Sequence, residues 1–252
     1  MSATFGLPIE ARIQGKISST DIPAVVMGKI SKSGDMSFYS NGPSRWDRDG
    51  DITPQNIFNV ASMTKALTSV AVLQLVEQGQ VALDESLDQH LPEMSKRLIL
   101  NQDNQIIEPQ NSITLRHLLT HTAGFGYWFT SPQLGRWNQL KTEINWMENY
   151  QPRLFESGSS FMYGTNIDWV GRLVEKISGI DLEQYFRQRI CGPLGMDSTW
   201  YNVPDELEHL VVGSSYRDPN NRTIVKKEYQ KMSPSKDFNG GGGLSSSPED
   251  YG

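Results

Sequence analysis

The chain has 252 residues and a formal net charge of −6, enough for one large domain or two modest ones. Its 23 lysines and arginines form no concentrated basic run, which argues against a nucleic-acid partner. No apolar run is long enough to cross a bilayer, and the first residues lack the apolar core of a signal peptide. A single cysteine, Cys191, excludes an intramolecular disulfide and fits a reducing compartment. We therefore expect a cytoplasmic protein without membrane contact.

The N-terminal third predicts a helix, a hairpin and a buried helix. Isoleucines at four-residue spacing favour a helix over 8–18, and two apolar runs, 22–30 and 36–39, flank a turn-rich link and predict a β-hairpin. The segment 62–79 is apolar nearly all round and ends at a glycine, which predicts a helix buried in a core.

The rest of the chain predicts several shorter helices. Thr114 is a predicted N-cap for a helix over 115–119, and an amphipathic helix over 166–178 is followed by another that runs to Ile190. The aromatic-rich segment 125–162 is typical either of a core or of a pocket wall. The polar segment 203–237 predicts loops, with one strand-like stretch at 210–212.

Ser62-Met63-Thr64-Lys65 stands at the start of the predicted buried helix. Positions i and i+3 share a helix face, so Lys65 can reach the Ser62 hydroxyl. Desolvation disfavours a charged lysine, so a lysine in an apolar surround can lose its proton near neutral pH, and Lys65 is a candidate base for a serine nucleophile. The same four residues are also typical of an ordinary helix cap beside a solvated charge.

Two other features carry weaker signals. His117 and His121 lie four residues apart on a short helix, but no third ligand cluster is near, and we expect no metal site. Cys191 is expected to be packed. The run Gly240–Gly243 lacks the lysine and hydroxyl of a phosphate loop, which leaves a wide pocket wall or a tight chain connection as its role.

Five motifs in order resemble the serine β-lactamase and penicillin-binding-protein superfamily. They are Ser62–Lys65, Leu118–Gly124, Phe161–Asn166, Pro193–Met196 and Gly241–Ser246. The pattern is most similar to class C β-lactamase-like family VIII carboxylesterases and to fungal β-lactamase-like acyltransferases. The resemblance extends from about residue 20 to the last residue.

The resemblance implies roles for six residues. Ser62 is the acylated nucleophile, Lys65 lowers the pKa of its neighbours and Tyr163 carries the proton. Thr165, Gly241 and Gly242 are implied in substrate binding. Without the resemblance, Tyr163 is more typical of a core tyrosine with a satisfied hydroxyl.

Two departures from the family pattern bear on activity. Thr165 stands where the lactamases have asparagine, which disfavours β-lactam hydrolysis and leaves ester chemistry. The family's third motif, on a strand that supplies an oxyanion N–H group, is expected beyond Gly252. Loss of one oxyanion donor costs about a hundred- to a thousand-fold in turnover, so we expect this chain alone to be impaired.

The sequence therefore predicts an α/β protein of the β-lactamase/DD-peptidase-like class, with an antiparallel sheet, flanking helices, a helical lobe and the C-terminal strands missing. Residues 1–83 and 205–252 form the expected α/β lobe, and residues 84–204 the helical lobe. The expected function is ester hydrolysis or acyl transfer on a small-molecule substrate through an acyl-serine, without a cofactor. The alternatives are a catalytically inactive penicillin-binding-like domain and a β-lactamase or D-Ala-D-Ala peptidase. The oligomeric state stays open.

Overall fold

The computed structural model describes residues 7–20, 22–140, 151–231 and 233–252, and these separate into two units. One unit comprises residues 1–60, 191–236 and 244–252, and the other comprises residues 61–190 and 237–243. The expected lobes differ from these units because residues 61–83 group with the helical part. Of the expected aromatic segment, Trp146 and Tyr150 lie outside the described residues.

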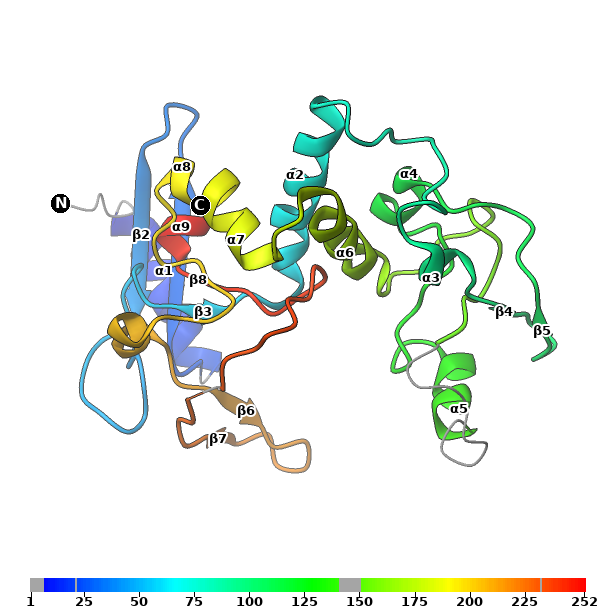
Figure 1. Ribbon diagram of the computed structural model, residues 1–252. Helices are drawn as coiled ribbons and strands as arrows, with labels where there is room; N and C mark the ends of the chain where they lie inside the picture. Colours follow the sequence, from blue (N-terminus) through cyan, green and yellow to red (C-terminus); the bar gives the residue numbers. More distant parts are fainter. Residues whose placement is uncertain (1–6, 21, 141–150, 232) are drawn as a thin grey trace. The chain divides into compact units, whose positions relative to one another are not determined.

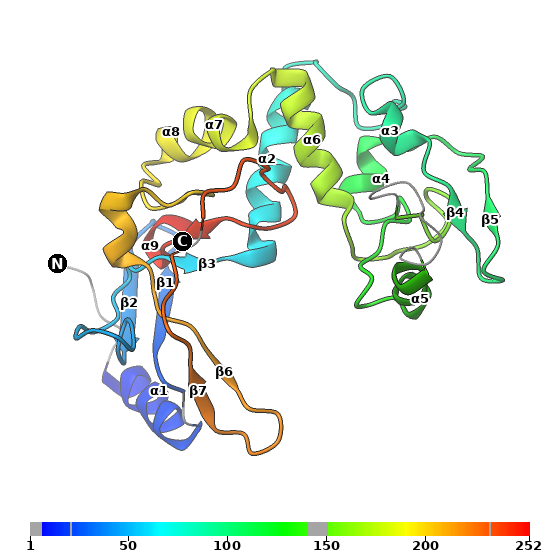
Figure 2. The ribbon, with the colours of Figure 1, turned by 60° about the horizontal axis from the view of Figure 1, so that its bottom comes forward.

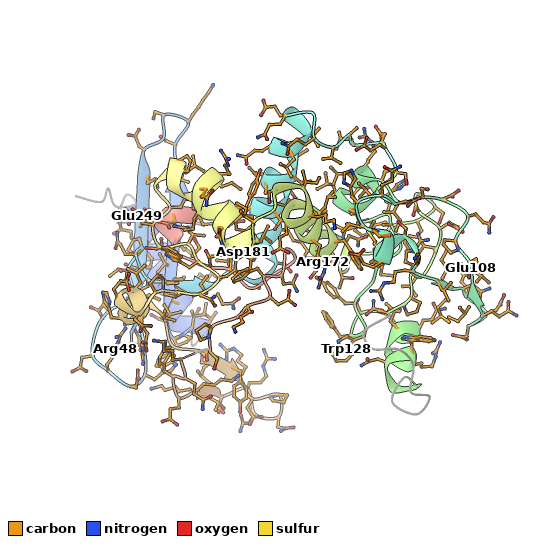
Figure 3. The ribbon with its side chains drawn as sticks, viewed as in Figure 1. Arg48, Glu108, Trp128, Arg172, Asp181 and Glu249 are labelled. Carbon is orange, nitrogen blue, oxygen red and sulfur yellow. The ribbon has the colours of Figure 1, made fainter. Side chains whose placement is uncertain are left out.

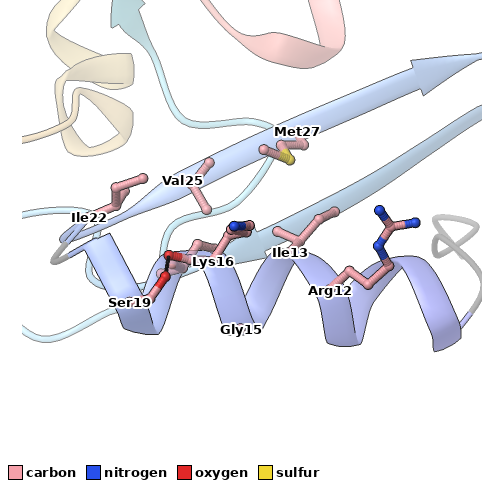
Figure 4. Close-up of a pocket in the computed structure, with 9 residues that line it drawn as sticks. Arg12, Ile13, Gly15, Lys16, Ser19, Ile22, Val25 and Met27 are labelled. Atoms are coloured by element: carbon pink, nitrogen blue, oxygen red, sulfur yellow. Dashed lines mark hydrogen bonds between the residues drawn. The ribbon is translucent and has the colours of Figure 1, made fainter.

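A hairpin and a helix form the N-terminal part of the first unit. Strands β1 (Val25–Ile30) and β2 (Met36–Asn41) pair antiparallel, as predicted, and helix α1 (Leu7–Thr20) is also confirmed. The first strand begins at Val25 rather than at Ile22, and Pro23, which has no N–H group to donate to a ladder, lies in between. A mostly apolar groove of about 590 Å³ lies between α1 and β1, and none of the predicted site residues lines it (Figure 4).

The remainder of the first unit is built from short elements. Strand β3 (Phe58–Asn59) pairs with β8 (Ser245–Ser246), and β6 (Ser215–Arg217) pairs with β7 (Ile224–Lys226). The hairpin of β6 and β7 was not predicted, because its polar sequence has no apolar alternation. The expected strand at 210–212 is wrong: Val211 makes only an isolated bridge with Ile57. The helical elements are α8 (Gly192–Leu194), a 3₁₀ helix (Asp205–Leu210) and α9 (Pro248–Tyr251).

Two long helices form the core of the second unit. Helix α2 (Thr64–Glu77) and helix α6 (Asn166–Ser178) lie side by side, both near the places that the sequence predicts (Figure 1). Helix α2 buries Leu67, Ala71, Val72 and Leu75, whereas α6 buries Ile167, Val170, Leu173 and Val174. Gly179 ends α6 in a left-handed conformation with φ of 74°, which a residue without a Cβ adopts readily.

Burial of α2 is one-sided. Val70 and Leu73 are 46% and 44% exposed, so the expectation of a helix buried all round is wrong for this face. Its cause is that α6 and α7 (Leu182–Phe186) pack against the opposite face of α2.

The second unit also contains several short elements, most of which gather on the side of α6 away from α2 (Figure 2). They are α3 (Pro92–Ser95), β4 (Ile99–Leu100), β5 (Ile106–Ile107), α4 (Leu115–Leu119), α5 (Pro132–Leu140) and a π-helical turn (Arg187–Cys191). Thr114 caps α4 as predicted, because its side chain accepts from the His117 N–H group. Cys191 is fully buried, also as predicted. Among the described helices, none is long and apolar enough to span a membrane.

Candidate active site

Ser62 lies in a 3₁₀ turn (Ala61–Met63) directly before α2, and its side chain is exposed. Ala61 takes a left-handed conformation with φ of 45°, which is costly for a residue with a Cβ. The Thr64 hydroxyl donates to the Ala61 carbonyl at 2.7 Å and holds this turn closed. The serine is thereby presented at the N-terminus of a helix, where the helix dipole favours developing negative charge.

The Lys65 ammonium connects three acceptors. Its Nζ donates to Ser62 Oγ at 3.1 Å, to Tyr127 Oη at 3.2 Å and to the Gly241 carbonyl at 2.6 Å. A lysine has three N–H donors, and the Tyr163 hydroxyl, which is also hydrogen-bonded to Lys65, shares them with these partners. The contact of Ser62 with Lys65 agrees with the geometry expected from their spacing.

The protonation of Lys65 differs from the sequence expectation. Burial alone would lower the pKa of Lys65, but its hydrogen bonds to Tyr163 and Tyr127 outweigh this, and the pKa is raised above its ordinary value. The expectation of a lysine that is neutral near pH 7 is therefore wrong. A fixed ammonium in this position acts on its neighbours by its charge.

Two tyrosines flank the ammonium and are shifted in opposite directions. Burial alone would raise the pKa of Tyr163, but its hydrogen bonds to Ser62 and Lys65 outweigh burial and lower it. Burial raises the pKa of Tyr127, and its bond to Lys65 offsets this only in part. Titratable groups whose pKa values are driven apart mark acid and base assignments. Tyr163 is therefore the tyrosine suited to lose a proton, and Tyr127 the one suited to keep it.

The three predicted binding residues have different surroundings. The Gly241 carbonyl is bonded to Lys65, so this glycine joins the cluster. A Cβ on residue 242 would make only ordinary van der Waals contact, with the Ala61 carbonyl oxygen at 3.8 Å. Thr165 is the N-cap residue of α6, and its side chain makes no capping hydrogen bond.

Asn166, one position after the place where the lactamases have asparagine, is hydrogen-bonded to the turn around His121 and Phe125. Its side chain is fully buried, and its Nδ2 lies 3.0 Å from the Phe125 carbonyl and 3.0 Å from His121 Nδ1. It ties α6 to the turn that precedes Tyr127. The Asn166 side chain therefore stabilises this turn.

The histidines also serve the local structure. His117 Nδ1 accepts from the Thr114 N–H group at 3.2 Å, which completes the cap of α4. The His121 ring lies 4.7 Å from the Tyr163 ring. In the described part of the chain, no group of three His, Cys, Asp or Glu side chains is placed to hold a metal ion.

The family model described as beta-lactamase matches residues 10–252. This chain belongs to the beta-lactamase family. The family assignment agrees with the resemblance that the motifs indicated and with an α/β fold of the β-lactamase/DD-peptidase-like class.

Similar proteins carry acyltransferase and esterase names. Acyltransferase mokF of Monascus pilosus is 31% identical over 96% of this chain and 64% of its own length. Lovastatin esterase of Penicillium rubens is 31% identical over 84% of this chain and 57% of its own length. The solved structure of unliganded simvastatin synthase (LovD) from Aspergillus terreus, as a selenomethionyl derivative, superposes with a TM-score of 0.85 at 28% identity, over 98% of this chain and 66% of that chain. The chain thus spans less than two thirds of the length of both curated relatives.

Two members of the cluster were missed from the sequence. Tyr127 lies in the aromatic-rich segment 125–162 and Asp168 in the amphipathic helix predicted over 166–178, but neither was singled out. Tyr127 carried no distinguishing signal, because it lies 62 positions from Lys65. Asp168 carried a weak one, since a carboxylate on the buried side of an amphipathic helix needs a partner.

Proposed function

We propose that this beta-lactamase family chain carries the acyl-serine site of an ester-acting hydrolase or acyltransferase. The observation that supports this most directly is the contact of Lys65 Nζ with Ser62 Oγ at 3.1 Å, with Tyr163 hydrogen-bonded to both residues. The roles of Ser62, Lys65 and Tyr163 expected by resemblance belong to this proposal.

The first half-reaction acylates the serine. Tyr163, as phenolate, accepts the proton of Ser62 Oγ while that oxygen attacks the ester carbonyl carbon. The tetrahedral intermediate collapses, the bond to the leaving alcohol breaks, and the Tyr163 hydroxyl returns the proton to the alcohol oxygen. Lys65 stays protonated throughout and stabilises the phenolate by its charge.

The second half-reaction regenerates the enzyme. Water or an alcohol attacks the acyl-serine carbonyl carbon and loses its proton to Tyr163. The bond to Ser62 Oγ then breaks, the serine oxygen takes the proton back from Tyr163, and an acid or a new ester leaves. No step calls for a metal or a cofactor. The choice between water and alcohol decides between hydrolysis and acyl transfer.

Exposed aromatic side chains near this cluster support an apolar ester as substrate. Phe129 is 64% exposed and stacks on Tyr127 at 4.9 Å between ring centroids, and Trp128 is 55% exposed (Figure 3). Phe161 is also 64% exposed and lies 6.2 Å from the His121 ring. Exposed apolar side chains gathered in one place are typical of ligand-binding surfaces. The names of the relatives, which include an acyltransferase and an esterase, agree with ester chemistry.

A fluorophosphonate probe tests the proposal. We expect covalent labelling at Ser62, read by mass spectrometry of peptides, and its loss in Ser62→Ala. Ser69→Ala is the matched control, because Ser69 stands in α2, the helix that follows Ser62, and its hydroxyl donates to the Lys65 carbonyl at 2.8 Å. Labelling elsewhere, or its absence in folded protein, contradicts the assignment. Adding a primary alcohol to an assay with p-nitrophenyl butyrate then separates transfer from hydrolysis by the product formed.

A further inference from the structure

A chain of contacts leads from helix α6 to the catalytic lysine. Asp168, in the first turn of α6, is hydrogen-bonded through its carboxylate to the Asn239 side chain. Asn239 Oδ1 in turn accepts from the Gly241 N–H group at 2.9 Å. The Gly241 carbonyl then accepts from Lys65 Nζ at 2.6 Å. Every link lies within one unit of the structure.

The glycine turn packs closely against α6, and α2 holds it as well, because the Thr68 hydroxyl donates to the Gly240 carbonyl at 2.8 Å. A Cβ on residue 240 would lie 2.5 Å from the Ile167 carbonyl oxygen and 2.9 Å from the Gly171 Cα. A Cβ on residue 241 would overlap the Asp168 carboxyl. The glycines therefore allow close approach of the turn to the helix. This supports the tight-connection role for Gly240 and Gly241.

The Gly241 carbonyl has a special place among the three acceptors of Lys65. The other two are hydroxyl oxygens, which can rotate and can donate as well as accept. A backbone carbonyl only accepts, and its bond to Nζ is the shortest of the three. Holding one N–H in a fixed direction leaves the other two aimed at Ser62 and Tyr127.

We propose that Asp168 is a positioning residue, which through Asn239 holds the Gly241 carbonyl on the Lys65 ammonium and so keeps that ammonium aimed at Ser62. The proposal rests on the function proposed above. Helix α6 positions the Asp168 carboxylate beside the glycine turn. One of its oxygens, Oδ2, is buried without a hydrogen-bond donor among the described residues. Its carboxylate is therefore held by few partners, of which Asn239 is one.

Two substitutions of Asp168 separate the effect of its hydrogen bond to Asn239 from the effect of its negative charge. Asp168→Asn removes the charge but keeps an oxygen that accepts from Asn239, whereas Asp168→Ala removes both. A displacement of the reacting groups by about 1 Å costs on the order of a hundredfold, so we expect Asp168→Ala to lower the maximal rate of Ser62 labelling by about 10- to 100-fold. Asp168→Asn should stay within about fivefold of the wild type, because its hydrogen bond survives. The concentration of probe for half-maximal rate should change little in either variant.

The pH profile of labelling distinguishes this role from a general loss of structure. The groups that face Tyr163 are Lys65 from α2, Tyr127 and His121 from the loops around α4, and Asp168 from α6. The Asp168 charge raises the pKa of Tyr163, so its removal alone shifts the acidic limb of the profile to lower pH. Displacement of the Lys65 ammonium shifts the acidic limb to higher pH, because the positive charge that lowers the pKa of Tyr163 is then farther away. We expect the second shift in Asp168→Ala and not in Asp168→Asn; a shift in the same direction in both variants overturns the proposal.

Amide hydrogen exchange gives a readout that does not depend on activity. The Gly241 N–H group, bonded to Asn239, should exchange at least about tenfold faster in Asp168→Ala and at the wild-type rate in Asp168→Asn. Glu175→Ala is the matched control, because Glu175 is another partly buried carboxyl of α6 and accepts from the Leu182 N–H group at 3.0 Å. Unchanged exchange at Gly241 in Asp168→Ala overturns the positioning role whatever the activity. Absence of Ser62 labelling in the wild type contradicts the proposed function alone.

Discussion

Replacing Lys65 by methionine removes the ammonium while keeping a side chain of similar length. Three hydrogen bonds disappear at once: those from Nζ to Ser62, Tyr127 and the Gly241 carbonyl. Tyr163 also loses the charge that lowers its pKa, so less phenolate is present at neutral pH. Proton transfer by a positioned group contributes about 10²- to 10⁴-fold, equivalent to about 3 to 5 kcal/mol of transition-state stabilisation.

The assay is hydrolysis of p-nitrophenyl butyrate between pH 5 and pH 10 by the wild type and by Lys65→Met. We expect kcat/KM at pH 7 to fall by about 10²- to 10⁴-fold and the activity that remains to rise toward alkaline pH. Lys176→Met is the control, since Lys176 lies exposed in the last turn of α6. A thermal melt of each variant checks that the fold is kept. Activity of Lys65→Met within about tenfold of the wild type would refute the role given to the ammonium.

Three further predictions concern specificity and stability. In a full-length relative that carries these motifs, short-chain p-nitrophenyl esters should give a higher kcat/KM than nitrocefin, because Thr165 stands where the lactamases have asparagine; a preference for nitrocefin would contradict this. Burial raises the pKa of the Asp168 carboxyl in the folded protein above its unfolded value of 3.8. The contribution of this group to folding stability is therefore fully present below pH 3.8 and is lost as the pH rises through the folded-state pKa. Asp168→Asn should therefore melt at a higher temperature than the wild type at pH 7, with a difference that vanishes below about pH 3.8, and an equal or lower melting temperature at pH 7 counts against it. Leu173→Ala, at a fully buried position of α6, should lower the free energy of unfolding by about 2–5 kcal/mol in urea titrations, and a loss below about 1 kcal/mol would mean that the site collapses around the cavity.

Local sequence rules were enough to predict that the Ser62 and Lys65 side chains meet. Positions three apart at the start of a helix share one face, so the contact of Ser62 with Lys65 follows from spacing alone. The caps at Thr114 and Gly179 follow from side-chain and backbone preferences of single residues. The order of five short motifs along the chain was enough to predict the family.

Which distant residues contact Lys65, and in which direction its pKa shifts, depended on the tertiary structure alone. Tyr127 lies 62 positions and Gly241 176 positions from Lys65, and no periodicity relates residues so far apart. Packing of the glycine turn against α6 brings the Gly241 carbonyl to Nζ. Hydrogen bonds to the Tyr163 and Tyr127 hydroxyls outweigh the desolvation that would otherwise lower the pKa of Lys65. At the start of α6, Asn166 contacts His121 and Phe125, which are equally remote in the sequence. Sequence therefore determined which residues are suited to the chemistry, whereas long-range packing determined which of them meet and which carries the proton, because pKa values depend on neighbours that only the folded chain brings together.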